Sequence, residues 1–285
     1  MRPLSLRRGL QRAVLCLGLT LAAAAPALAQ LAEGGARRLA LGRAGVALGG
    51  EAWGVANPAT WATLADRRLA LEGSQAFGLA DLRLGAASAA VPTSFGTLAV
   101  SGRSFGGSVH RETRVVAGIA RPLALSRVRA LDVGLAVGVE SASTEGFGSA
   151  STVLLDAGVQ GDLLPALRLG LSARNLLGLG RGAETDLQRS VSTVPTLAVG
   201  LAYTPSDHAV LVLDALQDLD RGLSMRAGAE ARPVDVLALR VGVSTQPVRY
   251  TAGLGVLAGP ARVDLAVEQH ETLGLTPAFG VEVGF

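Results

Sequence analysis

Regular alternation of apolar residues with small or polar ones is the feature that most constrains the fold of this chain. In the stretch VDVLALRVGVS, Leu239 and Val241 fall on one face, and Ala238, Arg240 and Gly242 fall on the other. Such period-two alternation indicates a strand whose two faces meet different environments. About fourteen such segments, each near the ~10 residues of a tilted transmembrane strand, follow one another to the C-terminus. They begin near residues 67, 79, 95, 109, 128, 151, 166, 193, 207, 222, 235, 248, 261 and 276.

The prolines support this division into strands. Every second connection contains one, and an antiparallel barrel with both ends on one side places these connections together as periplasmic turns. Proline cannot donate a hydrogen bond to a strand ladder, so it suits turns and strand ends. The six residues are Pro92, Pro122, Pro165, Pro205, Pro233 and Pro260.

A soluble β-sandwich also alternates, but it needs a polar exterior. Here the second face is mostly Gly, Ala and Ser with scattered charges, which suits a partly filled lumen, whereas the apolar face suits lipid. We therefore predict an all-β fold, a transmembrane antiparallel β-barrel of about fourteen strands over residues 66–285. The charges could line a conduction path or pair across strands to hold the wall together. The predicted lumen-facing residues are Arg168, Arg174, Arg226, Glu230, Arg232, Arg240, Arg262, Asp264 and Glu268.

The N-terminus has the pattern of an export signal. Four arginines among the first twelve residues precede an apolar run from Ala13 to Ala25, and Ala27-Leu28-Ala29 resembles a signal-peptidase site. We expect cleavage after Ala29, which makes residues 1–29 a signal peptide. An exported β-barrel of this kind is expected in the cell outer membrane of a diderm bacterium. The only cysteine, Cys16, falls in this segment. The mature chain would then carry 22 basic and 23 acidic residues, so its charge predicts no nucleic-acid partner.

The sequence predicts no enzyme, no metal site and no cofactor. The G-x-S-x-G pattern at residues 102–106 falls between two alternating strands, whereas a hydrolase elbow needs a strand-to-helix turn. The three histidines, at 110, 208 and 270, do not have metal-site spacing. The stretch Asp218-Leu219-Asp220-Arg221-Gly222 has no glutamate at the twelfth position of a calcium loop, so a hairpin turn explains it better.

The stretch LGRAGVALGGEAWGVANPATW, residues 41–61, is rich in glycine. A phosphate-binding loop would carry the lysine of G-x-x-x-x-G-K-[ST], and this chain contains no lysine. Glycines also permit a close approach of the backbone to a crowded wall, and Asn57-Pro58 favours a turn towards the first strand. Trp53 and Trp61 would then be packing residues, although a flexible linker is an alternative.

The whole mature chain resembles a known family. The N-terminal ARRLALGRAGVALGGEAWGVANPATWATL is similar to the opening segment of FadL-like outer-membrane proteins, in the branch that contains the type IX secretion proteins PorV and PorQ. LRLGLSARNLLG, LSMRAGAEARPVDVLALRVG and the closing ARVDLAVEQHETLGLTPAFGVEVGF are similar to that branch as well. The resemblance implies a fourteen-stranded barrel with residues 30–65 folded into the lumen as a plug. The plug residues singled out are Gly42, Gly45, Gly49, Gly50, Trp53, Asn57, Pro58 and Trp61.

The resemblance also implies partners and a function. In similar proteins a terminal aromatic on the last strand is recognised by the barrel-assembly machinery, and here Phe279, Val281, Val283 and Phe285 form the row that would face outer-membrane lipid. The predicted function is that of a component or adaptor of protein secretion across the outer membrane, with secretion-system components or secreted cargo as partners. The alternative is a FadL-like passive transporter of hydrophobic small molecules. The longest extracellular connection, about residues 177–192, offers a small platform on which a partner domain could dock.

Overall fold

The computed structural model describes residues 34–124, 130–177, 179–181, 194–220 and 222–285, and the predicted signal peptide lies outside them. None of the helices in these ranges is long and apolar enough to cross a membrane. A short α-helix, α2 (Gly35–Ala40), and a 3₁₀-helix, η1 (Pro58–Thr63), precede the strands. The strands are β1 (Arg68–Gln75), β2 (Arg83–Thr93), β3 (Gly96–Gly106), β4 (His110–Ala124), β5 (Ala130–Thr144), β6 (Gly148–Leu164), β7 (Leu167–Arg174), β8 (Leu179–Arg181), β9 (Thr196–Ser206), β10 (Ala209–Asp218), β11 (Gly222–Val234), β12 (Leu237–Thr245), β13 (Val248–Ala258), β14 (Ala261–His270) and β15 (Gly274–Gly284).

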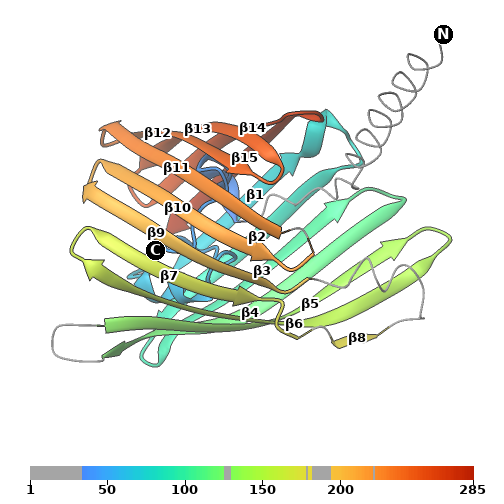
Figure 1. Cartoon of the computed structure of the whole chain (residues 1–285), viewed down its shortest axis with the longest axis horizontal. Helices are drawn as coiled ribbons and strands as arrows, with labels where there is room; N and C mark the ends of the chain where they lie inside the picture. Colours follow the sequence, from blue (N-terminus) through green and yellow to red (C-terminus); the bar gives the residue numbers. More distant parts are fainter. Residues whose placement is uncertain (1–33, 125–129, 178, 182–193, 221) are drawn as a thin grey trace, which may run out of the picture. The chain divides into compact units, whose positions relative to one another are not determined.

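Neighbouring strands pair antiparallel and the sheet closes on itself, so the fold class is confirmed as a fourteen-stranded β-barrel. The closing pair is β1 with β15, in which Arg68 lies opposite Gly284 (Figure 1). We call the end where β1 begins and β15 ends the terminal end, and the other the far end. The short β8 is additional: it pairs with residues 151–153 of β6, beyond the stretch of β6 that pairs with β7.

The strand starts agree closely with those predicted. The largest offset is at β2, expected near residue 79 but beginning at Arg83, because a 3₁₀ turn, η2 (Ala76–Gly78), lengthens the preceding connection. Pro165 and Pro260 lie in tight turns of the terminal end. The other four predicted turn prolines instead occupy the last residues of β2, β4, β9 and β11, where pairing is about to end.

The two faces of the wall are as the alternation predicted. On β12, Leu239 and Val241 are 48% and 60% exposed, whereas Ala238 and Arg240 are 0% and 3% exposed. The outward-facing residues are apolar along the barrel, the surface expected of a wall that meets lipid. Near the end of the chain, Phe279 is on this outer face, where its ring covers Gly73 of β1. Phe285 is exposed, and Val281 and Val283 are half-buried.

Residues 34–64, which we call the luminal segment, lie inside the barrel (Figure 1). Nearly all of them are buried, including every residue of α2. The wall makes room for this segment with glycines: a Cβ at nine inward positions would meet atoms of the segment. These wall glycines are Gly118, Gly134, Gly158, Gly170, Gly200, Gly228, Gly242, Gly253 and Gly280.

The contacts of the wall glycines follow the circumference of the barrel in order. Gly280 of β15 meets Ala36, Gly228 of β11 meets Leu41, and the strands between β11 and β4 meet successively later residues. At the end of the series, Gly118 of β4 meets Trp61. The luminal segment therefore winds around the inner wall, and the missing side chains allow backbone to approach backbone.

Candidate functional site

The luminal segment has a first half, residues 35–47, and a second half, residues 52–64. Asn57 links these halves to each other and to the wall. Its side-chain oxygen accepts a hydrogen bond from the backbone N–H of Ala59 (3.0 Å) and so caps η1, in which Pro58 takes the first position. Its amide nitrogen donates to the carbonyls of Val46 (2.8 Å) and of Val159 on β6 (3.2 Å). The predicted turn at Asn57-Pro58 is thus the start of a 3₁₀-helix, and Asn57 is fully buried with its polar atoms paired.

The four plug glycines that were predicted to approach the wall serve different purposes. Gly42 does so: it has φ +67°, and a Cβ would meet the Ala227 carbonyl oxygen at 2.6 Å. A Cβ at Gly45 or Gly49 would instead meet side chains of the luminal segment itself, and at Gly50 it would meet nothing within 4 Å. The wall glycines, which sequence reasoning missed, provide most of the close approach; their only signal is a glycine near the middle of successive strands.

Buried ion pairs hold the first half of the luminal segment. Glu230 of β11 accepts from Arg37 (2.7 Å) and from Arg240 of β12 (2.6 Å), and Arg240 also pairs with Asp264 of β14 (2.7 Å). Towards the far end, Glu268 of β14 accepts from Arg43 (2.7 Å). Burial costs each charge its hydration, and bidentate pairing of this kind offsets much of that cost.

Backbone groups of the first half are also held by the wall. The N–H groups of Gly45 and Val46 both donate to one carboxylate oxygen of Asp214 on β10, at 2.6 and 3.1 Å. Thr251 of β13 accepts from the N–H of Gly42 (3.0 Å) and donates to the carbonyl of Ala40 (2.9 Å). Arg37, Arg43 and Asp214 were not among the predicted site residues, because alternation alone does not reveal a partner on the luminal segment.

The structure groups most of the predicted lumen-facing residues into this network. Arg226, Glu230, Arg240, Asp264 and Glu268 are buried. Arg232 pairs with Glu230 (3.3 Å), and Arg262 pairs with Asp264 (2.7 Å), Glu51 (3.2 Å) and Glu282 (3.5 Å). Arg174 is half-buried near Arg226. Arg168 lies apart, at the terminal end of β7, where it pairs with the exposed Asp162 (2.7 Å).

The second half of the luminal segment contacts the wall mainly through apolar groups. Trp61 is 2% exposed, its ring lies against Gly54 and Gly118, and its Nε1 donates to the carbonyl of Ala52 (2.9 Å). Two ion pairs on this side lie within the wall. Arg114 of β4 pairs with Asp156 of β6 (2.9 Å), and Arg103 of β3 with Glu140 of β5 (2.6 Å).

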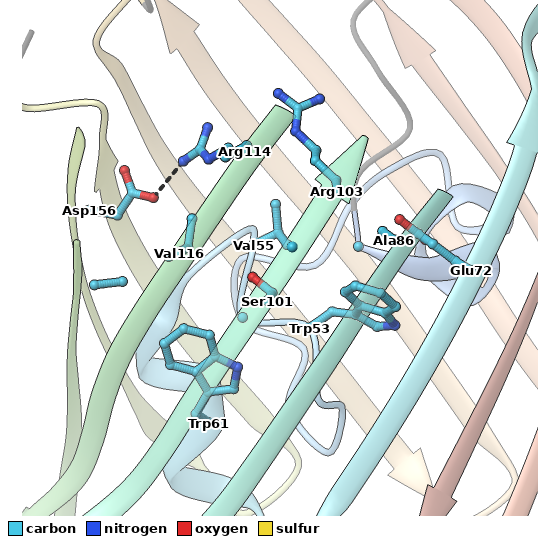
Figure 2. A pocket seen from close by; sticks show the side chains of 14 residues that line it. Trp53, Val55, Trp61, Glu72, Ala86, Ser101, Arg103, Arg114, Val116 and Asp156 are labelled. Atoms are coloured by element: carbon cyan, nitrogen blue, oxygen red, sulfur yellow. Dashed lines mark hydrogen bonds and ion pairs between the residues drawn. The ribbon is translucent and has the colours of Figure 1, made fainter. Parts of the chain in front are cut away.

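A small cavity of about 40 Å³, which we call the far cavity, lies between this second half and strands β1 to β6 (Figure 2). Trp61 contacts Gly118 of β4, whereas Arg114, which lines the cavity, is four residues nearer the far end of the same strand. The cavity therefore lies on the far-end side of Trp61. Its lining combines indole rings and small apolar side chains with charged and hydroxyl groups. The apolar residues are Trp53, Val55, Trp61, Ala86, Val116 and Ala136; the polar residues are Glu72, Ser101, Arg103, Arg114 and Asp156.

The lining of the far cavity has the composition of a binding site. The cavity is small, but it combines apolar walls with a few polar groups, as small-molecule sites do. The G-x-S-x-G pattern lies within β3 and not on a strand-to-helix turn, so it does not have the geometry of a hydrolase elbow. Among the described residues, no cluster of three His, Cys, Asp or Glu side chains could hold a metal ion.

Comparison with protein-family models and with curated proteins gives no match. The fold does match solved structures. A toluene transporter of Ralstonia pickettii, TbuX, is similar over 90% of this chain and 99% of its own, with a TM-score of 0.66 and 12% identity. The monoaromatic hydrocarbon channel CymD is similar over 90% and 98%, with a TM-score of 0.64 and 12% identity. A FadL homologue of Pseudomonas aeruginosa is similar over 90% and 98%, with a TM-score of 0.57 and 10% identity. At these identities the chain shares the fold of FadL-like barrels, and the narrower PorV/PorQ resemblance finds no counterpart among these matches.

Proposed function

We propose that this chain is an outer-membrane channel for small hydrophobic molecules, which bind in the far cavity on their way through the barrel. The observation that carries the proposal is the far cavity itself, a space lined by two indole rings and a few polar groups inside a barrel whose outer face is apolar. Aromatic and aliphatic side chains favour an apolar ligand, and a few polar groups orient it. The fold shared with a toluene transporter and a monoaromatic hydrocarbon channel supports the same direction.

Secretion adaptor, the function that the sequence resemblance favoured, has less support. Its docking platform, residues 177–192, lies largely outside the described residues. Most other far-end connections in the described part are tight: residues 107–109, 145–147, 246–247 and 271–273. Such turns offer a partner protein little surface, so we retain secretion components and secreted cargo only as partners to be tested.

Binding can be measured with the protein's own fluorophores. The chain contains two tryptophans, Trp53 and Trp61, and both line the far cavity. Titration with toluene should change their emission saturably, and toluene should accumulate faster in cells that carry the barrel. Ala86→Phe should fill the cavity and weaken both effects, whereas Ala87→Phe, one residue along β2 on the exposed face, should not. Equal behaviour of the two variants would overturn the proposed function.

The C-terminal row is part of the same proposal. Phe279, Val281, Val283 and Phe285 would serve as the signal for the barrel-assembly machinery, since the first and last of them are exposed on the outer surface. Deleting Phe285, whose side chain is 70% exposed, should lower the heat-modifiable, folded fraction in outer membranes. Val281→Ala, which keeps the terminal aromatic, is the control. Unchanged assembly after the deletion would remove this role.

A further inference from the structure

A second, larger cavity lies at the terminal end of the barrel, the end that an outer-membrane barrel of this topology has in the periplasm. Its volume is about 330 Å³, within the range of small-molecule sites, and we call it the terminal cavity. It lies beside the β13–β14 turn, where Gly259 and Pro260 form part of its lining. Of the described residues that line it, none also lines the far cavity, so the two cavities are different sites.

Four arginines line the terminal cavity, and no carboxylate of the described residues does. They come from four different elements: Arg37 from α2, Arg68 from the start of β1, Arg232 from near the end of β11 and Arg262 from near the start of β14. The pairing of β11 with β12 is irregular at Arg232, because residues 232–233 lie opposite a single residue of β12. Irregularities of this kind re-aim side chains at the rims of barrels.

The acidic partners of these arginines lie behind them. The side chains of Arg232 and Arg68 are 33% and 27% exposed, whereas their partners Glu230 and Glu282 are 1% and 3% exposed. On β11, Glu230 is two residues further from the terminal end than Arg232. The carboxylates are therefore deeper in the barrel, and the positive groups face the terminal cavity.

Two of the four guanidinium groups use few of their donors. A guanidinium group has five N–H donors. Within the described part of the chain, Arg68 donates one hydrogen bond to Glu282 (3.2 Å) and Arg232 donates one to Glu230 (3.3 Å), both long for charged pairs. The Nε of Arg68 is buried without a hydrogen-bond partner. Both groups thus keep donors for a ligand.

The charges around the terminal cavity do not balance. Ion pairs join five arginines to four carboxylates, so this network has one positive charge in excess. Its members are Arg37, Arg68, Arg232, Arg240 and Arg262 with Glu51, Glu230, Asp264 and Glu282. A charge that has lost hydration is costly unless it is paired, and a bound anion would offset that cost.

We propose that the terminal cavity binds a phosphate group. Arginine pairs readily with both carboxylate and phosphate, but a carboxylate has two oxygens in one plane, which one or two guanidinium groups satisfy. A phosphate group has oxygens in tetrahedral directions and more than one negative charge at neutral pH, so it matches arginines that come from four elements. A Cβ at Gly50 or Gly259 would meet nothing within 4 Å, which leaves room for the molecule that carries the phosphate. That molecule is a soluble phosphate compound of the periplasm or a phospholipid of the inner leaflet.

Binding of inorganic phosphate to the purified barrel is the first test. Calorimetric titration in detergent should show saturable binding, and Arg68→Gln with Arg232→Gln should weaken it by about tenfold or more, because hydrogen bonds between charged groups are lost. The carboxylates that these two arginines contact keep other arginine partners, so the barrel should still fold. Arg121→Gln with Arg168→Gln is the matched control, because both arginines are at the terminal end but outside the cavity. Equal binding by the two double variants would overturn the site.

Two further measurements identify the ligand. Benzoate, a planar anion with one charge, should bind more weakly than phosphate, and benzoate binding at least as tightly would overturn the assignment to a phosphate group. Native mass spectrometry of barrels from membranes that contain phosphatidylglycerol separates the two sources. A lipid retained by the wild type and lost from the Arg68→Gln and Arg232→Gln double variant indicates a headgroup, and phosphate binding without a retained lipid indicates a soluble compound.

Heat-modifiable mobility identifies the folded fraction of each variant. If the double variant does not fold, Arg232→Gln alone takes its place, because Arg232 is the most exposed of the four arginines. Wild-type protein that binds neither inorganic phosphate nor phosphatidylglycerol would overturn the proposal. Toluene binding in the far cavity is measured separately by tryptophan emission, so its failure would leave the phosphate site standing.

Discussion

The two halves of the luminal segment are attached to the barrel by different physical means. Residues 35–47 meet strands β10 to β14 through buried charges, and Arg37 and Arg43 each form an ion pair with a wall glutamate. Residues 52–64 meet strands β2 to β6 mainly through Trp61, Ala59 and the wall glycines, and two ion pairs there, Arg114–Asp156 and Arg103–Glu140, lie within the wall. A buried ion pair is directional and costly to break, whereas apolar contacts can re-form in another arrangement. The far cavity lies on the apolar side, where the attachment is the more adaptable.

Breaking the charged attachment should have the largest effect. Glu230→Ala removes the carboxylate shared by Arg37 and Arg240 and leaves two guanidinium groups buried without it. We expect the free energy of unfolding in detergent to fall by about 3–5 kcal/mol, as for other buried pairs that lose one partner. Asp162→Ala is the control, because its pair with Arg168 is largely exposed and should contribute less than ~1 kcal/mol. Equal losses would mean that the lumen is wet enough to screen both pairs.

Separating the two halves should come next. Asn57→Ala removes the side chain that bonds Ala59, Val46 and the wall carbonyl of Val159. Each buried group left unpaired costs about 1–3 kcal/mol, so we expect a loss of about 2–4 kcal/mol, reduced if water enters. Urea unfolding followed by circular dichroism measures it. Asn175→Ala is the control, because Asn175 is also buried but donates to the carbonyl of Val194, outside the luminal segment. A loss of stability as large as that of Asn57→Ala would show that the link between the two halves has no special importance.

A smaller effect should come from the wall glycines of the apolar half. A Cβ at Gly134 would collide with the backbone of Pro58 and Ala59, whereas a Cβ at Gly280 would make an ordinary 3.5 Å contact with Ala36. Gly134→Ala should therefore destabilise the barrel by roughly 1–3 kcal/mol through overpacking, and Gly280→Ala should be nearly neutral. Because the added methyl group would push η1 away from β5, we expect Gly134→Ala to raise the conductance as well. A neutral Gly134→Ala would show that η1 shifts without cost.

The wall was predictable from sequence for a physical reason. Each strand must alternate between an apolar outer face and a small or polar inner one. The faces of Leu239 and Arg240 can therefore be predicted without knowledge of the neighbouring strands. The short β8 was missed because three residues are too few to show a period. The inner contacts were not predictable. Gly134 or Gly158 looks like one more small residue, and its role appears only when Ala59 or Asn57, from a much earlier part of the chain, lies against it.

The function was predicted less well than the fold, and Asn57 shows why. The Gly-rich stretch and Asn-Pro-Ala carried the resemblance to the PorV/PorQ branch, yet in the structure Asn57 and Pro58 form the internal link of the luminal segment. Residues of this kind report how the segment is built and not what passes it. The choice of a small-molecule ligand would instead depend on residues such as Val55, Ala86 and Val116, which line the far cavity. These residues lie in ordinary alternating or irregular sequence.

The smallest expected effect sharpens the account of the apolar half. Trp61→Phe keeps an aromatic ring but loses the Nε1–H that donates to the carbonyl of Ala52. That carbonyl still accepts from Ser88 (2.7 Å), so it is not left unpaired, and the loss should be only about 1 kcal/mol. Ser88→Ala alone should be similarly mild, because Trp61 then remains as donor. The double variant strands the carbonyl in an apolar setting and should cost more than the two single changes together, a coupling that a double-mutant cycle of unfolding free energies measures. Strict additivity would mean that water reaches Ala52, and the loop at residues 49–54 would then be open to solvent even with its side-chain contacts in place.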